Sequence, residues 1–298
     1  MTTVAVVARP GLREAAQALR DLVAWLRTRN IRVLVEERTA ALIDGAGREG
    51  VTVAAGREAA AEADAVVVLG GDGTLLAASQ LLGRPSVPVL GVNFGSLGFL
   101  TEIALPELYA ALAGVLDGSY QYEERGMLRA VLRRPNQADL TVDVLNDVVV
   151  TKASLSRIIE LDVTVDGLFV SAFRADGLIV SSPTGSTAYN LAAGGPILHP
   201  ALPAVVLTPI CPHMLTNRPL VLSDQSVIEV QLRGSRDDEA HTTFDGQRGF
   251  AFSAADTVTV TRSPRSLRLV RAPDRDYFEV LRTKLKWGET TARRPGSH

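Results

Sequence analysis

The sequence feature that most constrains the fold is the segment Val66–Ser79, which reads VVVLGGDGTLLAAS. Its first residues form a short apolar, β-branched run, which is typical of a strand covered on both faces. The residues after Gly73 predict a helix. The glycines in between let the backbone turn tightly and approach a ligand, and the first amides of the helix favour an anion there. The segment therefore predicts a strand–loop–helix unit with an anion site at the end of the strand.

The rest of the first third repeats this alternation of strand and helix. Short unbroken apolar runs predict strands, and apolar residues at helical spacing predict helices. The predicted strands cover residues 2–8, 31–36, 65–69 and 87–92, and the predicted helices cover residues 12–26, 74–83 and 105–118. Because strands that alternate with helices form parallel sheets with helices on both faces, we expect an α/β N-terminal domain with a parallel sheet.

The pattern changes near Tyr122. From there to about Arg271 the chain shows strand-like runs and almost no helical periodicity, and Asp166-Gly167 between two alternating runs predicts a hairpin. This half predicts a mainly-β C-terminal domain over residues 122–271, a sandwich or a related stack of sheets. The α/β domain, which carries the GGDGT loop, covers residues 1–121. Helical spacing returns in residues 274–287.

Composition narrows the classes of partner. The chain has 31 basic and 33 acidic residues, so no basic excess indicates nucleic acid or an anionic membrane. No run of about 18 apolar residues predicts a membrane span. The single cysteine, Cys211, rules out an internal disulfide and suits a reducing compartment. The four histidines show no metal-ligand spacing. We therefore expect a soluble cytoplasmic protein that binds neither nucleic acid nor membrane.

Two further glycine-rich segments carry candidate binding groups. NFGSLGFLTE, residues 93–102, follows a predicted strand and places Gly95 and Gly98 at the carboxyl end of the sheet, where such sheets bind ligands. Residues 176–200 are dense in hydroxyl groups and glycines, which suits a nucleobase and ribose pocket, and Tyr189 among them can stack on a base. Long irregular segments are usually functional or disordered, and the apolar residues interleaved here argue against disorder.

Each motif also has a purely structural interpretation. Asp72 can cap the helix that follows it, and residues 93–102 can be a tight strand-to-helix connection. The polar pair Asn146-Asp147 can be a turn between short strands, and FDGQ at 244–247 can be a hairpin turn. The double glycine Gly70-Gly71 favours the binding interpretation of the first loop, because a helix cap does not need it.

Together these motifs resemble the NAD kinases, which phosphorylate NAD to NADP. The matching segments are GGDGTLL at 70–76, NFGSLGFLTE at 93–102, LND at 145–147, SRIIELDV at 156–163, RADGLIVSSPTGSTAYNLAAGGPILHP at 174–200, CPHMLTNRPLVL at 211–222 and DGQ at 245–247. GGDG alone is also similar to the diacylglycerol-type lipid kinases and the phosphofructokinases, whereas GSTAYNLAAGGP separates the NAD kinases from them. The resemblance implies an α/β domain and a β-rich domain, with the chain end, residues 272–298, returning to the first domain.

The resemblance also implies roles for individual residues. Asp72 matches the proton acceptor, with Gly73 beside it, and Asn146 and Asp147 match a pair that binds the dinucleotide. The other substrate-binding positions that it implies are Arg157, Arg174, Asp176, Thr187, Ala188, Tyr189, Asn190, Leu191, Ala192 and Gln247. Many members have a serine where this chain has Ala192, so one hydroxyl contact is absent. The residues expected to cradle phosphates are Gly70, Gly71, Thr74, Gly95 and Gly98.

The expected reaction transfers the γ-phosphoryl group of ATP to the 2′-hydroxyl of the adenosine ribose of NAD. Asp72 serves as base, and a divalent metal ion, Mg²⁺ or Mn²⁺, supplies the main neutralising charge. The sequence identifies no protein ligand for that ion. The resemblance also implies a homodimer or homotetramer. Two alternatives stay open, namely a lipid or sugar kinase of the same superfamily and a non-catalytic dinucleotide sensor. The run STAYN argues against the first, and Asp72, which a sensor would not need, argues against the second.

Overall fold

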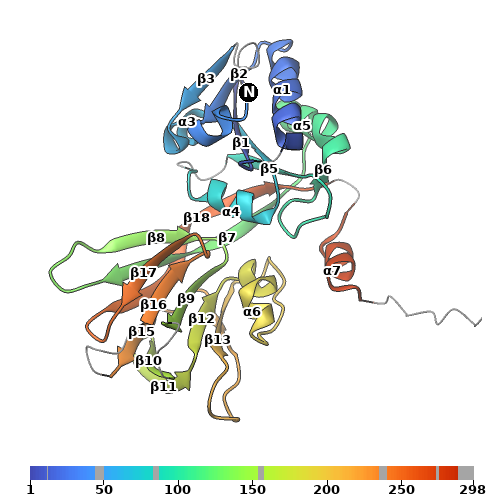
Figure 1. The fold of residues 1–298 in the computed structure, drawn as a ribbon. Coiled ribbons are helices and arrows are strands. Elements are labelled where there is room, and N and C mark those ends of the chain that lie inside the picture. The colour runs from blue at the N-terminus through green and yellow to red at the C-terminus, as the bar shows by residue number, and fades with distance from the viewer. Residues whose placement is uncertain are drawn as a thin grey trace, which may run out of the picture. The chain divides into compact units, whose positions relative to one another are not determined.

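The computed structural model describes residues 1–11, 13–43, 50–82, 87–153, 158–234, 240–272 and 275–287. The chain divides into two compact units (Figure 1). Unit 1 consists of Met1–Glu123 together with Leu269–His298, and unit 2 consists of Glu124–Arg268. None of the helices in the described ranges is long and apolar enough to cross a membrane.

Unit 1 is built on a parallel sheet with the strand order β5-β4-β1-β2-β3. These strands are β1 (Thr3–Ala8), β2 (Arg32–Glu36), β3 (Val51–Ala54), β4 (Ala65–Leu69) and β5 (Pro88–Asn93), and the short β6 (Ile103–Ala104) pairs in parallel with β5. Every residue of β4 is buried, as expected for a strand covered on both faces. The predicted α/β domain with a parallel sheet is confirmed.

Helices cover this sheet. They are α1 (Arg13–Arg27), α2 (Glu37–Ala40), α3 (Gly56–Glu62), α4 (Asp72–Ser79) and α5 (Leu108–Asp117), with the 3₁₀ turn η2 (Leu105–Glu107) before α5. Apolar side chains of α1 and α5 share one core with alternate residues of the strands, among them Val4, Val67 and Leu90. Helix α4 begins at Asp72, two residues earlier than predicted, and Gly83 at its predicted end lies outside the described residues.

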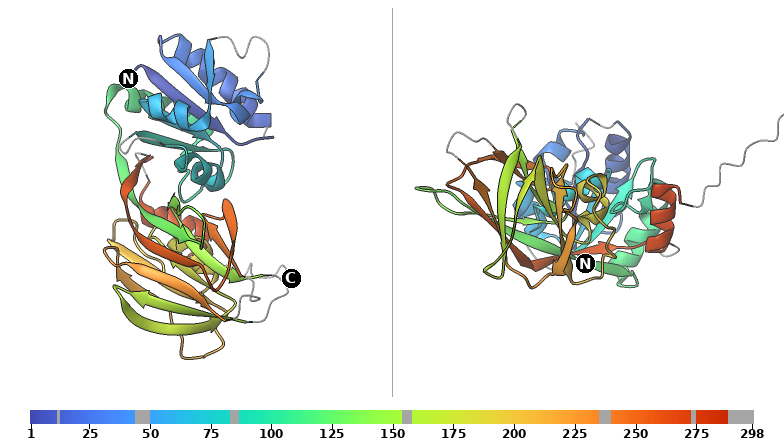
Figure 2. Two further views of the ribbon diagram at one scale, coloured as in Figure 1. Left: turned by 90° about the vertical axis from the view of Figure 1, so that its left-hand side faces the viewer. Right: turned by 90° about the horizontal axis from the view of Figure 1, so that it is seen from below.

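Unit 2 is mainly β, as predicted, and Figure 2 gives two further views of its strands, coloured green to orange. One six-stranded sheet has the order β14-β13-β12-β9-β16-β17, and β11-β10-β15-β18 with β7 and β8 form the other layer of strands. The strands are β7 (Tyr122–Arg133), β8 (Leu140–Val144), β9 (Asp147–Lys152), β10 (Ile159–Val165), β11 (Leu168–Ala175), β12 (Gly177–Ser181), β13 (Ala204–Ile210), β14 (Leu220–Ser223), β15 (Ile228–Arg233), β16 (Ala240–Phe244), β17 (Arg248–Phe252) and β18 (Thr257–Val270). Apolar residues of both layers form one core. The predicted hairpin at Asp166-Gly167 joins β10 to β11, and both residues have positive φ.

Two short elements follow β12, namely the 3₁₀ turn η3 (Gly185–Thr187) and the helix α6 (Tyr189–Ala192). After β18 the chain re-enters unit 1 and forms α7 (Tyr277–Leu285). The side chain of Asp276 caps this helix by accepting the N–H of Glu279. The implied return of the C-terminal helix to the first domain is therefore confirmed.

Candidate active site

Asp72 lies in the first turn of α4, directly after the glycine loop that follows β4. Its carboxylate accepts four hydrogen bonds from the segment that follows β5. Oδ2 accepts the N–H of Phe99 (2.9 Å), and Oδ1 accepts the N–H of Leu100 (3.0 Å). Thr101 donates both its N–H (3.1 Å) and its hydroxyl (3.0 Å) to Oδ1. The N-terminus of α4 has no side-chain cap, so the interpretation of Asp72 as a helix cap is wrong.

Two of the loop glycines are required by packing around Asp72. A Cβ atom at Gly70 would lie 2.5 Å from Oγ1 of Thr74, and a Cβ atom at Gly98 would lie 2.1 Å from Oδ1 of Asp72. Neither distance is compatible with van der Waals packing. Gly70 lets the first loop pack closely against Thr74 of the same segment, and Gly98 lets the second loop approach closely enough for its backbone amides to reach the carboxylate.

Three other loop glycines have no such explanation within the chain. A Cβ atom at Gly71, Gly73 or Gly95 would meet nothing within 4 Å. None of the three has the positive φ that favours glycine. Gly71, Gly73 and Gly95 are all exposed. What a glycine offers at such a position is the close approach of an external group to the backbone.

Asn93 at the end of β5 fixes the loop that holds Asp72. Its Nδ2 donates to the carbonyl oxygens of Thr101 (2.9 Å) and Ile103 (3.2 Å), and its Oδ1 accepts the N–H of Gly95 (3.3 Å). The side chain is 5% exposed. The loop connects β5 to β6 rather than to a helix, so its interpretation as a tight strand-to-helix connection is wrong.

A second carboxylate organises Asn146-Asp147 in unit 2. Asp245 accepts the backbone N–H groups of Leu145 (2.9 Å), Asn146 (2.7 Å) and Asp147 (3.2 Å). Its own N–H donates to the carbonyl oxygen of Asp147 (3.0 Å). Asp245 has a φ of 52° in the turn between β16 and β17. The FDGQ segment is therefore a hairpin turn, as its structural interpretation predicts, and it also holds the chain before β9.

Asp147 carries a buried acid group beside this cluster. Burial raises the pKa of Asp147 to about 7, and the nearby Asp245 carboxylate adds to the rise. The residue is 5% exposed. In the described part of the chain no group hydrogen-bonds its carboxylate, so the carboxyl group stays available to a ligand hydroxyl.

Family models match the two parts of the chain separately. The ATP-NAD kinase N-terminal domain matches residues 4–120, and the ATP-NAD kinase C-terminal domain matches residues 145–272. The chain belongs to the NAD kinase family. The NAD kinase of Citrifermentans bemidjiense is 46% identical over 292 residues, which cover 97% of this chain and 100% of that protein. The NAD kinase of Geotalea daltonii is 50% identical over 270 residues, 90% of this chain and 93% of that protein.

Solved structures of NAD and NADH kinases share the fold. Yeast NADH kinase complexed with NADH has a TM-score of 0.89 and 25% sequence identity, covering 97% of this chain and 89% of that chain. An NAD kinase from Archaeoglobus fulgidus in complex with ATP has a TM-score of 0.70 and 26% identity, covering 95% of this chain and 99% of that chain. The family resemblance inferred from the motifs is confirmed.

The NAD kinase motif GSTAYNLAAGGP forms η3, α6 and the turn after them. Asn190 is completely buried: its Nδ2 donates to the carbonyl oxygens of Ser186 (2.9 Å) and Pro196 (3.0 Å), and its Oδ1 accepts the hydroxyl of Thr208 (2.6 Å). A Cβ atom at Gly195 would lie 2.0 Å from that Oδ1. The Asn190 side chain therefore shapes the loop from inside.

The neighbours of Asn190 present the other face of the same motif. Tyr189 is 44% exposed, and Ala192 is exposed, whereas Thr187, Ala188 and Leu191 are half-buried. The segment follows the end of β12, where Ser181 pairs with Asp147. The exposed Gln247 follows Asp245 in the hairpin turn. The structure thus brings these predicted residues to the same end of the sheet as Asn146.

Arg174 lies near the end of β11, and Asp176 directly precedes β12, at the end of β12 opposite to Ser181. β9 and β12 are antiparallel, and Gly177 pairs with Thr151 while Ser181 pairs with Asp147. Four residues of strand separate the two ends by roughly 13 Å. Asp176 forms an ion pair with Lys152 (2.8 Å) there, and Arg174 is exposed. The predicted residues of unit 2 therefore form two groups. Arg157 lies outside the described residues.

The sequence interpretation gave no role to several residues that build the site. Asn93 and Asp245 act through hydrogen bonds to backbone groups, and Thr101 donates its N–H and its hydroxyl to the Asp72 carboxylate. Ser182 belongs with them, because its hydroxyl donates to the carbonyl oxygen of Leu145 (2.5 Å). Thr101 and Asn93 lie inside the segment NFGSLGFLTE, which was the available signal. Asp245 lies in the matching segment DGQ, and its Asp-Gly pair also carries a turn signal.

Proposed function

We propose that this chain catalyses the reaction for which its family is named, the phosphorylation of NAD to NADP with ATP as phosphoryl donor. One observation supports it most. The carboxylate of Asp72 is oriented by four donors, next to three exposed glycines that the fold itself does not require. A base beside an open backbone loop is the arrangement that a phosphoryl acceptor and a phosphate group need.

The hydrogen bonds of Asp72 favour one of its oxygens as the proton acceptor. Oδ1 accepts three hydrogen bonds from Leu100 and Thr101, whereas Oδ2 accepts one, from Phe99. A carboxylate oxygen has two lone-pair positions, so Oδ2 keeps one free. We propose that Oδ2 accepts the proton of the ribose 2′-hydroxyl at this free position. The hydroxyl oxygen then bonds to the γ-phosphorus of ATP, and ADP leaves with the electrons of the broken bond.

The nucleoside part of NAD is assigned to unit 2. The carboxyl group of Asp147 and the amide of Asn146 offer hydrogen-bond partners for ribose hydroxyls, and Tyr189 offers an exposed ring for a base. The Asp245 carboxylate sets the backbone of the Asn146-Asp147 pair. The proposed binding residues also include Gly73, Arg157, Arg174, Asp176, Thr187, Ala188, Leu191, Ala192 and Gln247. Asn190, which is completely buried, belongs to the binding segment through its support of the loop from inside.

A divalent cation, Mg²⁺ or Mn²⁺, completes the proposal by neutralising charge on the transferred phosphoryl group. Within the described ranges, no three His, Cys, Asp or Glu side chains gather as a ligand set. Without such a ligand set, the ion would be held mainly by phosphate oxygens of ATP, which is the usual way in which Mg²⁺ is bound. The role of the chain is then to orient the phosphates through the amides of Gly71, Gly73 and Gly95.

We also propose that the protein acts in the cytoplasm as a homodimer or homotetramer. The edge strand β11 exposes Leu168 (72%), Phe169 (62%) and Val170 (37%), and the edge strand β14 exposes Leu220 and Val221. Exposed apolar edge strands pair readily with another chain. Light scattering at working concentration should give a multiple of the chain mass. The mass of a single chain would contradict the assembly.

Incubation of the purified protein with NAD, ATP and Mg²⁺ tests the proposed activity. NADP should form, and diacylglycerol offered in place of NAD should not be phosphorylated. Polyphosphate in place of ATP would define the donor. Phosphorylation of the lipid without formation of NADP would replace the proposal with the lipid kinase alternative. Tight binding of NAD without any turnover would favour the sensor.

A further inference from the structure

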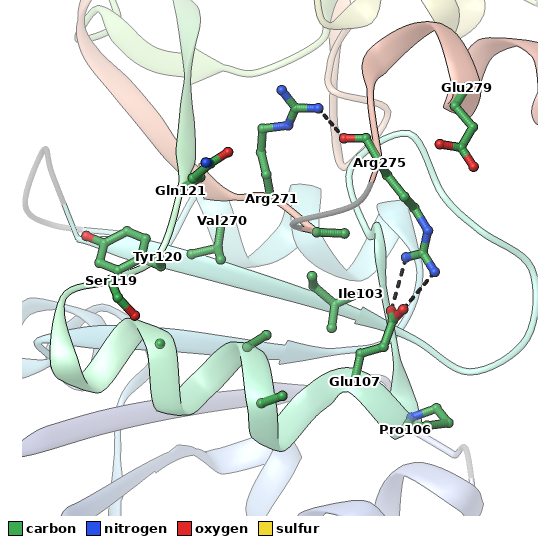
Figure 3. Close-up of a pocket in the computed structure, with 14 residues that line it drawn as sticks. Ile103, Pro106, Glu107, Ser119, Tyr120, Gln121, Val270, Arg271, Arg275 and Glu279 are labelled. Atoms are coloured by element: carbon green, nitrogen blue, oxygen red, sulfur yellow. Dashed lines mark hydrogen bonds and ion pairs between the residues drawn. The ribbon is translucent and has the colours of Figure 1, made fainter.

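Arg275 joins the chain segment before α7 to the loop that holds Asp72. Its guanidinium forms a forked ion pair with the carboxylate of Glu107, with Nη1–Oε2 and Nη2–Oε1 distances of 3.0 Å and 2.9 Å (Figure 3). Nη1 also donates to the backbone carbonyl oxygen of Glu102. All three residues belong to unit 1. A forked arginine–carboxylate pair fixes direction as well as distance.

The contacts continue from Arg275 to the carboxylate of Asp72 without interruption. Glu102 directly follows Thr101, whose N–H and hydroxyl both bond to Asp72. On the other side of β6, the carboxylate of Glu107 accepts the N–H of Ala104 (2.7 Å). Arg275 therefore holds the chain on both sides of β6, at the end of the loop whose amides orient Asp72.

The ion pair is electrostatically favourable where it stands. Burial by itself would raise the pKa of Glu107, but the N–H of Ala104 and the Arg275 guanidinium outweigh burial and lower that pKa. The ionised carboxylate is thus the form that the surroundings prefer, and the pair persists at neutral pH.

Asn93 holds the same loop from β5, whereas the side that Arg275 holds borders an open space. A cavity of about 640 Å³ lies beside the pair, between α5 and the returning segment (Figure 3). Small residues of α5, namely Ala110, Ala111 and Gly114, line one side of it, and Val270 and Arg271 line the other. Because the space beside Arg275 is open, loss of its side chain would not be compensated by an apolar layer packed against the loop.

We propose that Arg275 is a positioning residue for the phosphoryl transfer, acting on Asp72 through the segment Phe99–Glu102. The inference rests on the proposed function. Without the Glu102 contact the loop gains freedom at its end, and the amides that aim the carboxylate move with it. A displacement of about 1 Å at a reacting group can cost about 10²-fold in rate.

The test compares Arg275→Ala with two controls in steady-state formation of NADP. In Arg275→Ala, kcat should fall by about 10- to 100-fold, while the KM values for NAD and ATP stay within about threefold. Arg275→Lys should restore part of the rate, because lysine keeps the charge but not the fork. Arg282→Ala on α7 and Glu279→Gln at the same cavity change an exposed arginine and an exposed carboxylate, and both should keep kcat within about twofold.

Amide hydrogen exchange gives a readout that does not depend on activity. The N–H groups of Leu100 and Thr101 are hydrogen-bonded to Asp72. Their exchange rates should therefore rise in Arg275→Ala and stay unchanged in Arg282→Ala. If Arg275→Ala does not fold, Arg275→Lys and Glu107→Gln carry the same comparison, each with an expected loss of about 3- to 10-fold in kcat.

Two results would overturn the positioning role. One is a folded Arg275→Ala protein that keeps kcat within about twofold of the parent. The other is an equal loss in Arg282→Ala, which would show a general effect on the C-terminal segment. An absence of NADP formation by the unaltered protein would refute the proposed function instead, and the exchange rates of Leu100 and Thr101 would still decide whether Arg275 fixes the loop.

Discussion

Asp72 in unit 1 and Asp245 in unit 2 use the same device in different surroundings. Each carboxylate accepts the N–H groups of three consecutive residues from a distant part of the chain, Phe99–Thr101 for Asp72 and Leu145–Asp147 for Asp245. Asp245 is 5% exposed and lies in a hairpin turn, whereas Asp72 is half-buried and stands beside exposed glycines.

The difference lies in what each carboxylate has left to do. Asp245 is enclosed and serves the backbone of its neighbours. Asp72 keeps a free position on Oδ2 and faces a loop that admits an external group. The same hydrogen bonds therefore build a structural clamp in one unit and, in our proposal, an oriented base in the other. Substitutions at the two positions separate the clamp from the base.

Asp72→Asn should give the largest effect. It removes the base, and its NH₂ group would also face an N–H donor that now bonds to a carboxylate oxygen. The expected loss in kcat is about 10²–10⁴-fold. Rates are measured over a range of Mg²⁺, together with a thermal melt and an NAD titration. Recovery of kcat as Mg²⁺ rises would assign Asp72 to the metal instead.

Asp147 should make stability depend on pH near neutrality. Its pKa is raised to about 7 from 3.8, so the folded chain holds a proton that the unfolded chain releases between those values. The unfolding free energy should therefore fall as pH rises through this window, by on the order of 2–4 kcal/mol. Asp147→Asn stays neutral and should lose that slope. Denaturant titrations of both proteins at pH 5 and pH 8 make the comparison, and equal slopes would contradict the raised pKa.

Asp245→Asn should cost stability more than rate. One oxygen is replaced by an NH₂ group among three backbone donors, so we expect a loss of about 1–3 kcal/mol in unfolding free energy. The KM for NAD should rise, because the backbone of Asn146-Asp147 loses its support. At saturating NAD, kcat should fall by less than about tenfold. An unchanged denaturation midpoint would show that the clamp is dispensable.

Gly95→Ala should have the smallest effect on the fold. A Cβ atom at Gly95 meets nothing within 4 Å, so stability should change by less than about 0.5 kcal/mol. The KM for ATP should still rise severalfold if phosphate approaches this backbone. Gly98→Ala is the matched contrast, since its Cβ atom would overlap Oδ1 of Asp72. If Gly95→Ala leaves the KM for ATP unchanged, the phosphate does not approach the backbone at Gly95.

The sequence predicted those features that rest on local chemistry. The strand, glycine loop and helix around Gly70–Gly73 follow from apolar runs and glycine spacing, which adjacent residues determine. Short elements were missed because their residues show no clear apolar pattern. All four residues of β3 are half-buried or exposed, and α3 is rich in alanine, so its faces differ little in polarity. Neither gives a clear period.

The backbone contacts of Asp72 and Asp245 could not be predicted, because each carboxylate contacts residues far from it in the sequence. Asp245 lies 99 residues from Asn146, and neither its Asp-Gly turn signal nor the DGQ match indicates that contact. The four donors to Asp72 come from a loop 27 to 29 residues away. Only the sheet, which places the ends of β4 and β5 side by side, brings that loop to the carboxylate.

The ratio of two rates tests the central claim most directly. NADP formation is measured at saturating NAD and ATP for folded Asp72→Asn and folded Asp245→Asn. Both variants weaken the hydrogen bonds to three consecutive backbone N–H groups, but only Asp72→Asn also loses the proposed base. We predict a kcat for Asp72→Asn that is at least about tenfold below that of Asp245→Asn, since general-base assistance contributes about 10²–10⁴-fold. Equal values of kcat would show that Asp72 is a clamp and not the base.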